Sequence, residues 1–170
     1  MSATIQIDSF HGSTPVPNSN ISSIRFRRDD TDTQDYSSPI PIPSSGINYS
    51  WRKSIKANIT ISPSAQISNL RWYSDGIAWE NGVVCYVCHY SNYIQASVSD
   101  NTTEISGSDL ADSTIYTSAS PLVINSGIVI SNPNTGYGTQ DYLIMQLSVD
   151  SDAVQGVQSS HSFFYTWDEI

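Results

Sequence analysis

Two cysteines and a histidine lie close enough together in the sequence to suggest chemistry. Residues 81–93 read NGVVCYVCHYSNY, in which Cys85, Cys88 and His89 form the pattern C-x-x-C-H. This pattern is the attachment site of c-type haem, where both thiols reach one porphyrin. Here the cysteines lie in a run of β-branched and aromatic residues, which predicts a strand.

On a strand the two thiols would point to opposite faces, because side chains alternate. Their Cα atoms would lie roughly 10 Å apart at about 3.3 Å per residue, whereas a disulfide needs about 7 Å or less. The sequence therefore predicts neither haem nor a disulfide. It predicts two reduced cysteines, one or both packed in the core as small apolar side chains.

Other patterns that could support chemistry are weak. The acidic segment DDTDTQD, residues 29–35, is spaced loosely like a calcium loop but lacks the turn glycine and the closing glutamate. We interpret it as a solvated loop. Two cysteines cannot supply a Cys₄ zinc site, and no G-x-S-x-G or phosphate-binding pattern occurs. We predict no catalytic residues, no metal and no cofactor, although a carboxylate pair of a glycan hydrolase or lyase would not be visible in a sequence.

The elements that would position these residues are predicted to be strands. Apolar and polar residues alternate over residues 47–62 with one break at Lys53, so we expect a bend or two strands there. Further strands are predicted at residues 67–74, 82–91, 93–99, 114–124, 127–132, 142–150 and 161–169, and a short helical turn at 106–113. Roughly eight to ten strands separated by turn residues predict an all-β fold, a β-sandwich of the jelly-roll kind.

Residues 1–45 are predicted to form an extended N-terminal arm, and residues 46–170 the sandwich domain. Five of the eight prolines lie in the arm, and SSPIPIPSSG alternates proline with isoleucine. Proline fixes φ and removes a donor, which favours an extended path and excludes a central strand. The arm could pack on its own domain or reach a neighbour. The candidate partner-binding residues are Arg25, Phe26, Arg27, Arg28, Ile40 and Ile42.

Charge is unevenly distributed along the chain. Residues 1–71 hold all seven basic residues and five acids (+7 − 5 = +2), and residues 72–170 hold eleven acids and no Lys or Arg (−11), which gives the net charge of −9. Such a chain repels nucleic acid and anionic membranes. Either the charge serves solubility, or the basic part docks on an acidic partner. No hydrophobic run is long enough for a transmembrane helix and no signal sequence is visible, so we expect folding in a cytoplasm.

The aromatic residues, 11% of the chain, have two interpretations. They could pack in the core and between subunits, which we favour. Alternatively, an exposed row of them could bind glycans, as in a carbohydrate-binding module.

The C-terminal half, SPLVINSGIVISNPNTGYGTQDYLIMQLSVDSDAVQG followed by FFYTWDEI, resembles the small all-β structural proteins of tailed bacteriophages. With SWRKSIKANITISPSAQISNLRWYSDG, the resemblance covers roughly residues 47–170. The chain is most similar to capsid decoration (cement) proteins. The resemblance implies a non-enzymatic virion protein that is made in the bacterial cytoplasm. Such a protein would bind the major capsid protein or other virion subunits as a homo-oligomer, commonly a trimer. A neck, tail or baseplate component is the alternative within the same resemblance.

Overall fold

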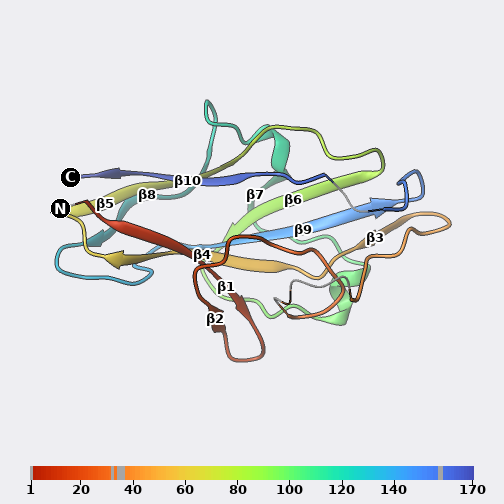
Figure 1. The fold of residues 1–170 in the computed structure, drawn as a ribbon, viewed down its shortest axis with the longest axis horizontal. Helices are drawn as coiled ribbons and strands as arrows, with labels where there is room; N and C mark the ends of the chain where they lie inside the picture. The colour runs from red at the N-terminus through yellow and green to blue at the C-terminus, as the bar shows by residue number, and fades with distance from the viewer. Residues whose placement is uncertain (1, 32, 34–36, 157–158) are drawn as a thin grey trace.

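The protein is an antiparallel β-sandwich built from a large and a small sheet (Figure 1). The computed structural model describes residues 2–31, 33, 37–156 and 159–170. The large sheet has the order β2 (Val16–Asn18), β1 (Thr4–His11), β4 (Lys53–Ile61), β9 (Tyr142–Asp150), β6 (Val83–Tyr90) and β7 (Ser108–Asp112), with β3 (Ile47–Tyr49) also paired to β9. The small sheet has the order β10 (Phe163–Glu169), β5 (Gln66–Ser74), β8 (Leu122–Ser131). The predicted all-β sandwich is confirmed, and the jelly-roll connectivity stays a prediction.

The core lies between the two sheets and follows from the alternation of side chains. Strand β4 contributes Ile55, Ala57 and Ile59, and the central strand of the small sheet contributes Leu70 and Trp72; all five are buried. Alternate positions of an antiparallel strand share one face, so the period of two in the sequence places these residues together.

Strand β9 is buried on both faces because the large sheet is covered on both sides. Its inner residues, Leu143, Met145 and Leu147, belong to the main core. On the outer face, Ile144 packs with Cys88 and with Ile105 of the loop that follows the short 3₁₀ helix η1 (Val98–Asn101). This explains why the segment YLIMQLSV is nearly continuous in apolar residues.

The break predicted near Lys53 is confirmed, because β3 and β4 are separate strands with residues 50–52 between them. Alternation places Lys53 on the same face of β4 as the core residues, but Lys53 is the first residue of the strand. Its Nζ donates to the carbonyl oxygens of Thr31, at 2.7 Å, and Asp29, at 3.4 Å. A buried ammonium thus replaces an apolar side chain where the sandwich is closed by a loop.

The predicted arm of residues 1–45 needs a correction for its first part. Residues 4–11 form β1, which pairs with β4 from Thr4 opposite Ile61 to Phe10 opposite Ser54. Asp8, Ser9 and Phe10 are buried. The prolines begin only at Pro15, so nothing prevents residues 4–11 from pairing, and the alternation of Ile5 and Ile7 gives β1 an apolar face for the core.

Three predicted elements also differ from the structure. Residues 93–97 form no strand, and Val98 and Ser99 begin η1. Of the helical turn predicted at residues 106–113, residues 108–112 form β7. The predicted strand at 114–124 begins only at Leu122, after the 3₁₀ helix η2 (Ser113–Ile115), and then runs on through the predicted strand at 127–132 as β8. Residues 108–112 became a strand because they pair with β6, which shows that strand pairing can override a weak local pattern.

Candidate functional site

The second part of the predicted arm folds back on its own sandwich. We call residues 19–45 the strap; in its described residues no strand or helix occurs. The backbone N–H of Ile21 donates to Ile7 of β1 at 2.8 Å, and that of Trp51 donates to Arg27 at 2.8 Å. The strap therefore runs from β1 to the segment between β3 and β4.

The six candidate partner-binding residues all lie in the strap, and most of them contact their own chain. Arg27 is buried, with Nε and Nη2 each 2.7 Å from the carboxylate of Asp29. Phe26 and Ile40 pack against the core. Of the six, only Ile42 is among the exposed large apolar residues, at 38%. Partner binding by these residues stays a prediction, and Arg27 could pair with a partner only by giving up its bonds to Asp29.

The two other strap arginines, Arg25 and Arg28, lie in different surroundings. Arg28 donates from Nε to Asn101 of η1 at 2.6 Å, and the same amide oxygen accepts from Trp51 Nε1 at 2.9 Å. Asn101 thus fixes the strap against the outer side of the large sheet. Arg25 is half-buried and is one of the residues that line a cleft.

That cleft, which we call the inter-sheet cleft, lies under the strap and has a volume of about 1260 Å³. One wall is the inner face of the large sheet and the other is the inner face of β5 and β10. Five of the six candidate residues line it; Arg28 does not. The walls contain Ile7, Ile55, Leu147, Trp72, Phe163 and Tyr165. The structure therefore brings the predicted strap residues together around a mainly apolar space.

A cluster around His161 closes one end of the inter-sheet cleft. The imidazole stacks on Trp79 with ring centroids 3.9 Å apart, and its Nδ1 lies 3.5 Å from Asp75 Oδ1. Burial raises the pKa of Asp75, but hydrogen bonds from the N–H groups of Ser162 and Ile77, together with His161, outweigh it and leave that pKa below its usual value. Asp75 is therefore an ionised carboxylate that orients His161.

The outer face of the small sheet is a second surface of interest. We define it by the outward side chains Arg71 and Tyr73 of β5, Phe164 and Asp168 of β10, and Val123 and Ile128 of β8. Phe164 stacks on Tyr73 at 5.0 Å, and Phe164, Val123 and Ile128 are 42%, 44% and 52% exposed. Arg71 Nη2 lies 2.5 Å from Asp168 Oδ1, so the charged groups of this face neutralise each other.

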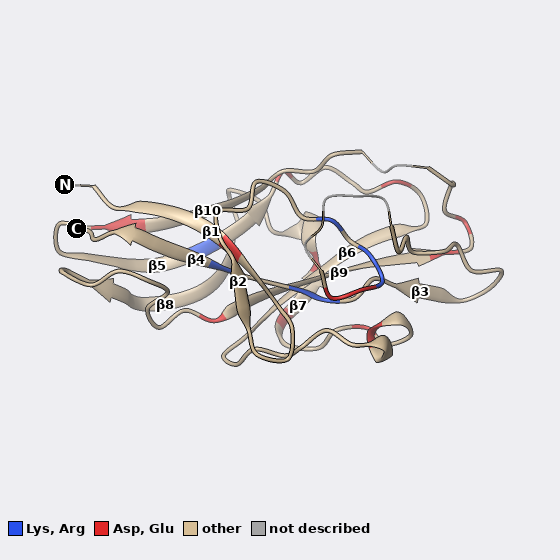
Figure 2. Cartoon of the chain, turned by 60° about the horizontal axis from the view of Figure 1, so that its bottom comes forward, with Lys and Arg blue, Asp and Glu red and all other residues tan. Residues whose placement is uncertain are grey.

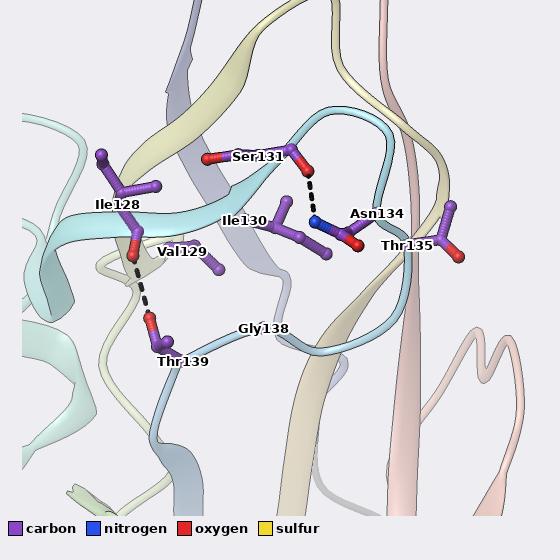
Figure 3. A pocket seen from close by; sticks show the side chains of 8 residues that line it. All are labelled: Ile128, Val129, Ile130, Ser131, Asn134, Thr135, Gly138 and Thr139. Carbon is purple, nitrogen blue, oxygen red and sulfur yellow. Dashed lines mark hydrogen bonds between the residues drawn. The ribbon is translucent and has the colours of Figure 1, made fainter.

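A smaller pocket of about 380 Å³ lies between β8 and the loop that leads to β9. Figure 3 shows the loop from Ser131 to Thr139 curving back alongside the strand. Asn134 Nδ2 donates to the Ser131 carbonyl at 3.0 Å, and Thr139 Oγ1 donates to the Ile128 carbonyl at 2.9 Å. The pocket lining is held by its own hydrogen bonds, which indicates a structural loop.

Cys85 and Cys88 lie in β6 as predicted, both buried and both free. Cys85 belongs to the main core, whereas Cys88 packs with Ile105 and Ile144 on the opposite face of the large sheet. The prediction that the two thiols point to opposite faces is confirmed. The imidazole of His89 lies between two carboxylates: its Nδ1 is 2.7 Å from Asp141 and its Nε2 is 3.3 Å from Asp109.

The acidic segment of residues 29–35 is described only in part, because residues 32 and 34–36 lie outside the described residues. Asp29 binds Arg27, and Asp30 accepts from the N–H of Gly12 at 2.8 Å. Among the described residues, no three His, Cys, Asp or Glu side chains gather in a way that could hold a metal ion.

Figure 2 shows that the basic residues occur in a few short segments, whereas the acidic residues are spread over strands and turns. Arg52 forms a two-pronged ion pair with Asp100, which is buried, with Nη2 2.7 Å from Oδ1. The Lys56 ammonium lies 3.9 Å over the ring of Tyr142. Much of the basic charge is therefore used inside the chain, and the predicted docking of a basic part on an acidic partner stays a prediction.

The aromatic residues mostly pack inside. Phe164, at 42%, is the most exposed of the described aromatic residues, and the others are buried or half-buried. Phe10 packs edge-on against both Tyr137 and Tyr142. The exposed aromatic row that glycan binding would require is therefore not present in the described residues.

The inter-sheet cleft and the outer face of the small sheet could not be located from the sequence. The one signal in the sequence was the alternation of side chains in WYS and FFYTW. It places Trp72 and Tyr165 on one face of their strands, and Tyr73 and Phe164 on the other. Pairing of β5 with β10 then sets these residues side by side, Trp72 opposite Tyr165 and Tyr73 opposite Phe164.

Comparison of the chain with known protein families, with characterised proteins and with solved structures found no match. In the described part of the chain, no helix has the length and apolar character needed to cross a bilayer.

Proposed function

We propose that this protein is a non-enzymatic virion structural subunit, of the capsid decoration type, that assembles with copies of itself through the outer face of the small sheet. The virion assignment is supported by the resemblance of residues 47–170 to phage structural proteins. The assembly is supported by one observation: Phe164, Val123 and Ile128 are exposed on a sheet face that carries no net charge.

Self-association through this face agrees with the charge of the chain. The protein carries a net charge of −9, so two copies repel each other over most of their surfaces. On this face the charged side chains are Arg71 and Asp168, which pair with each other. A second copy can therefore approach here without that repulsion and can bury the apolar side chains.

The size of the face fits a subunit that needs more than one contact. Three strands about 4.8 Å apart and some nine residues long, at about 3.3 Å each, give a projected area of roughly 400 Å². A standard interface buries about 800 Å² on each partner. The proposed assembly, a trimer by preference, therefore uses this face together with a second patch, and binding to the major capsid protein or another virion subunit would gain from the multiple contacts.

The first test is the mass of the full chain in solution by light scattering. We expect about 56 kDa, three times the 18.7 kDa of one chain. Ile128→Asp places a carboxylate on the outer face of the small sheet and should yield monomers. Val98→Asp makes the same change at an exposed site in η1, where Val98 is 72% exposed, and should leave the mass unchanged.

A wild-type protein that stays at 18.7 kDa at high concentration would contradict self-assembly. Equal masses for the two variants would contradict the choice of face. The virion assignment is tested separately, by mass spectrometry of purified particles of the phage that carries the gene; absence of the chain from intact particles would rule it out.

A further inference from the structure

The inter-sheet cleft is large enough to hold a small molecule. Its volume of about 1260 Å³ exceeds the range of about 300–1,000 Å³ that is usual for such sites. The cleft is partly open to solvent, since exposed residues such as Ile42 and Val154 belong to its lining.

Both walls of the cleft are apolar. The large sheet contributes Ile7, Ile55 and Leu147, and the small sheet contributes Trp72 and Phe163, whose rings lie 5.4 Å apart. Such walls favour the transfer of a hydrocarbon chain or ring out of water. The polar residues of the lining, among them Arg25, Arg27 and Ser37, lie on the strap and on the segment that precedes β10.

Polar atoms on the small-sheet wall are buried without a partner. Trp72 Nε1 and Tyr165 Oη have no hydrogen-bond partner among the described residues, and Trp72 is fully buried. The two residues are directly opposite each other on β5 and β10. An unpaired buried donor is unfavourable, so an acceptor for these two groups would be stabilising. Both atoms are closed off from solvent in the described structure, so a ligand oxygen reaches them only when the side chains that cover them move aside.

These two groups define the polar part of the ligand. An indole N–H can only donate. Burial raises the pKa of Tyr165, so its hydroxyl stays protonated and can donate as well. Both donors are uncharged, and the buried cation of the lining, Arg27, is already paired with Asp29, so an anion would be costly to bury beside the two donors. The complement is a neutral oxygen acceptor on an apolar body.

We propose that the inter-sheet cleft binds a neutral apolar molecule with a carbonyl oxygen, in the class of long-chain ketones and esters, and that Trp72 and Tyr165 donate to that oxygen. His161 adds a further polar atom at the end of the cleft: its Nε2 is also buried and has no partner in the described part of the chain. The strap, with Phe26 and Ile40, covers the bound molecule.

The test uses the full chain and the fluorescent apolar probe N-phenyl-naphthylamine. The probe should gain fluorescence on binding, and methyl heptyl ketone should displace it. Nonane, which has the same number of carbons and no oxygen, should displace it at least tenfold more weakly after correction for solubility. Trp72→Phe and Tyr165→Phe each remove one donor and keep an aromatic ring, so each should weaken ketone binding about fivefold, the equivalent of one neutral hydrogen bond, and leave nonane binding unchanged.

Matched controls remove the same groups elsewhere. Tyr90→Phe removes a hydroxyl that bonds Ser106 on the other side of the large sheet, and Trp51→Phe removes the N–H that bonds Asn101. Both should leave the ketone-to-nonane ratio as in the wild type. If Trp72→Phe does not fold, Tyr165→Phe decides alone, since its hydroxyl forms no bond in the described structure.

Three results would overturn the proposal. The first is no binding of the probe to the folded protein. The second is equal displacement by ketone and nonane, which would leave an apolar space without a polar recognition point. The third is a ketone-to-nonane ratio unaffected by Tyr165→Phe.

Discussion

Replacing Gln146 by leucine should destabilise the protein more than any surface change, although leucine is the more apolar residue. Gln146 is fully buried on the outer face of β9. Its Oε1 accepts from the N–H of Ile105 at 2.8 Å. Its Nε2 lies 3.0 Å from the Ser50 carbonyl oxygen, 3.1 Å from that of Asp100 and 3.0 Å from that of Thr103.

The magnitude follows from those bonds. Without the amide, the N–H of Ile105 is buried and unpaired, which costs about 2 kcal/mol. The two N–H groups of the amide also lose their bonds to the carbonyl oxygens, at about 1 kcal/mol each. The sum is about 4 kcal/mol, a large part of the 5 to 15 kcal/mol, roughly, that stabilises a typical domain.

Equilibrium urea unfolding followed by tryptophan fluorescence measures this loss. With a slope of about 2 kcal/mol per molar urea, the midpoint should fall by about 2 M. Gln95→Leu is the matched control, because Gln95 is exposed and its amide nitrogen donates to Asp30 at a long 3.4 Å in the described part of the chain. It should change the free energy of unfolding by about 0.5 kcal/mol or less.

A loss below about 1 kcal/mol for Gln146→Leu, or a loss equal to that of Gln95→Leu, would refute the reasoning. It would mean that the loop of residues 100–105 finds other partners for its backbone groups when the amide is removed.

Further predictions concern the cysteines, an acidic residue and a glycine. Burial raises the pKa of the Cys88 thiol to about 12 and also raises that of Cys85, so Ellman's reagent should react with neither in the native protein and with both after unfolding; fast native reaction would contradict their burial. The pKa of Asp75 is lowered in the folded state relative to its ordinary 3.8, so its contribution to stability is present above that value and is lost as the pH falls through the folded pKa. Urea midpoints of Asp75→Asn should therefore fall less steeply below about pH 4 than those of the wild type, and parallel curves would contradict this. Gly138 has φ +59°, and a Cβ there would overlap the Val129 carbonyl oxygen of β8, whereas a Cβ at Gly46 would meet nothing within 4 Å. Gly138→Ala should thus lose about 2 kcal/mol or more beyond Gly46→Ala in urea unfolding, and equal losses would show that the loop can move away.

The strands with a clear residue pattern could be predicted from the sequence. The strand at residues 142–150 and the break near Lys53 occur where they are predicted, since a run of apolar residues and a period of two are both typical of strands. The opposite orientation of Cys85 and Cys88 follows from the same period. In contrast, β1 was not predicted, because the proline-rich residues after it suggested an arm for the whole of residues 1–45.

The candidate sites could not be predicted from the sequence, for a different reason. The strap residues were identified as a group, but their position over the inter-sheet cleft depends on pairing between β1 and β4, about fifty residues apart. The unpaired polar atoms of Trp72 and Tyr165 depend on which groups fail to meet in space, and a sequence contains no distances between residues that are far apart in the chain.

The sequence by itself determined that the chain is an all-β sandwich with reduced, strand-borne cysteines, because side-chain alternation is a local property of the backbone. The tertiary structure decided that residues 4–11 complete the large sheet, that the strap closes on its own domain, and that β5 and β10 place aromatic residues on both of their faces. Those outcomes depend on which strands pair, and strand pairing is decided by contacts between residues far apart in the chain.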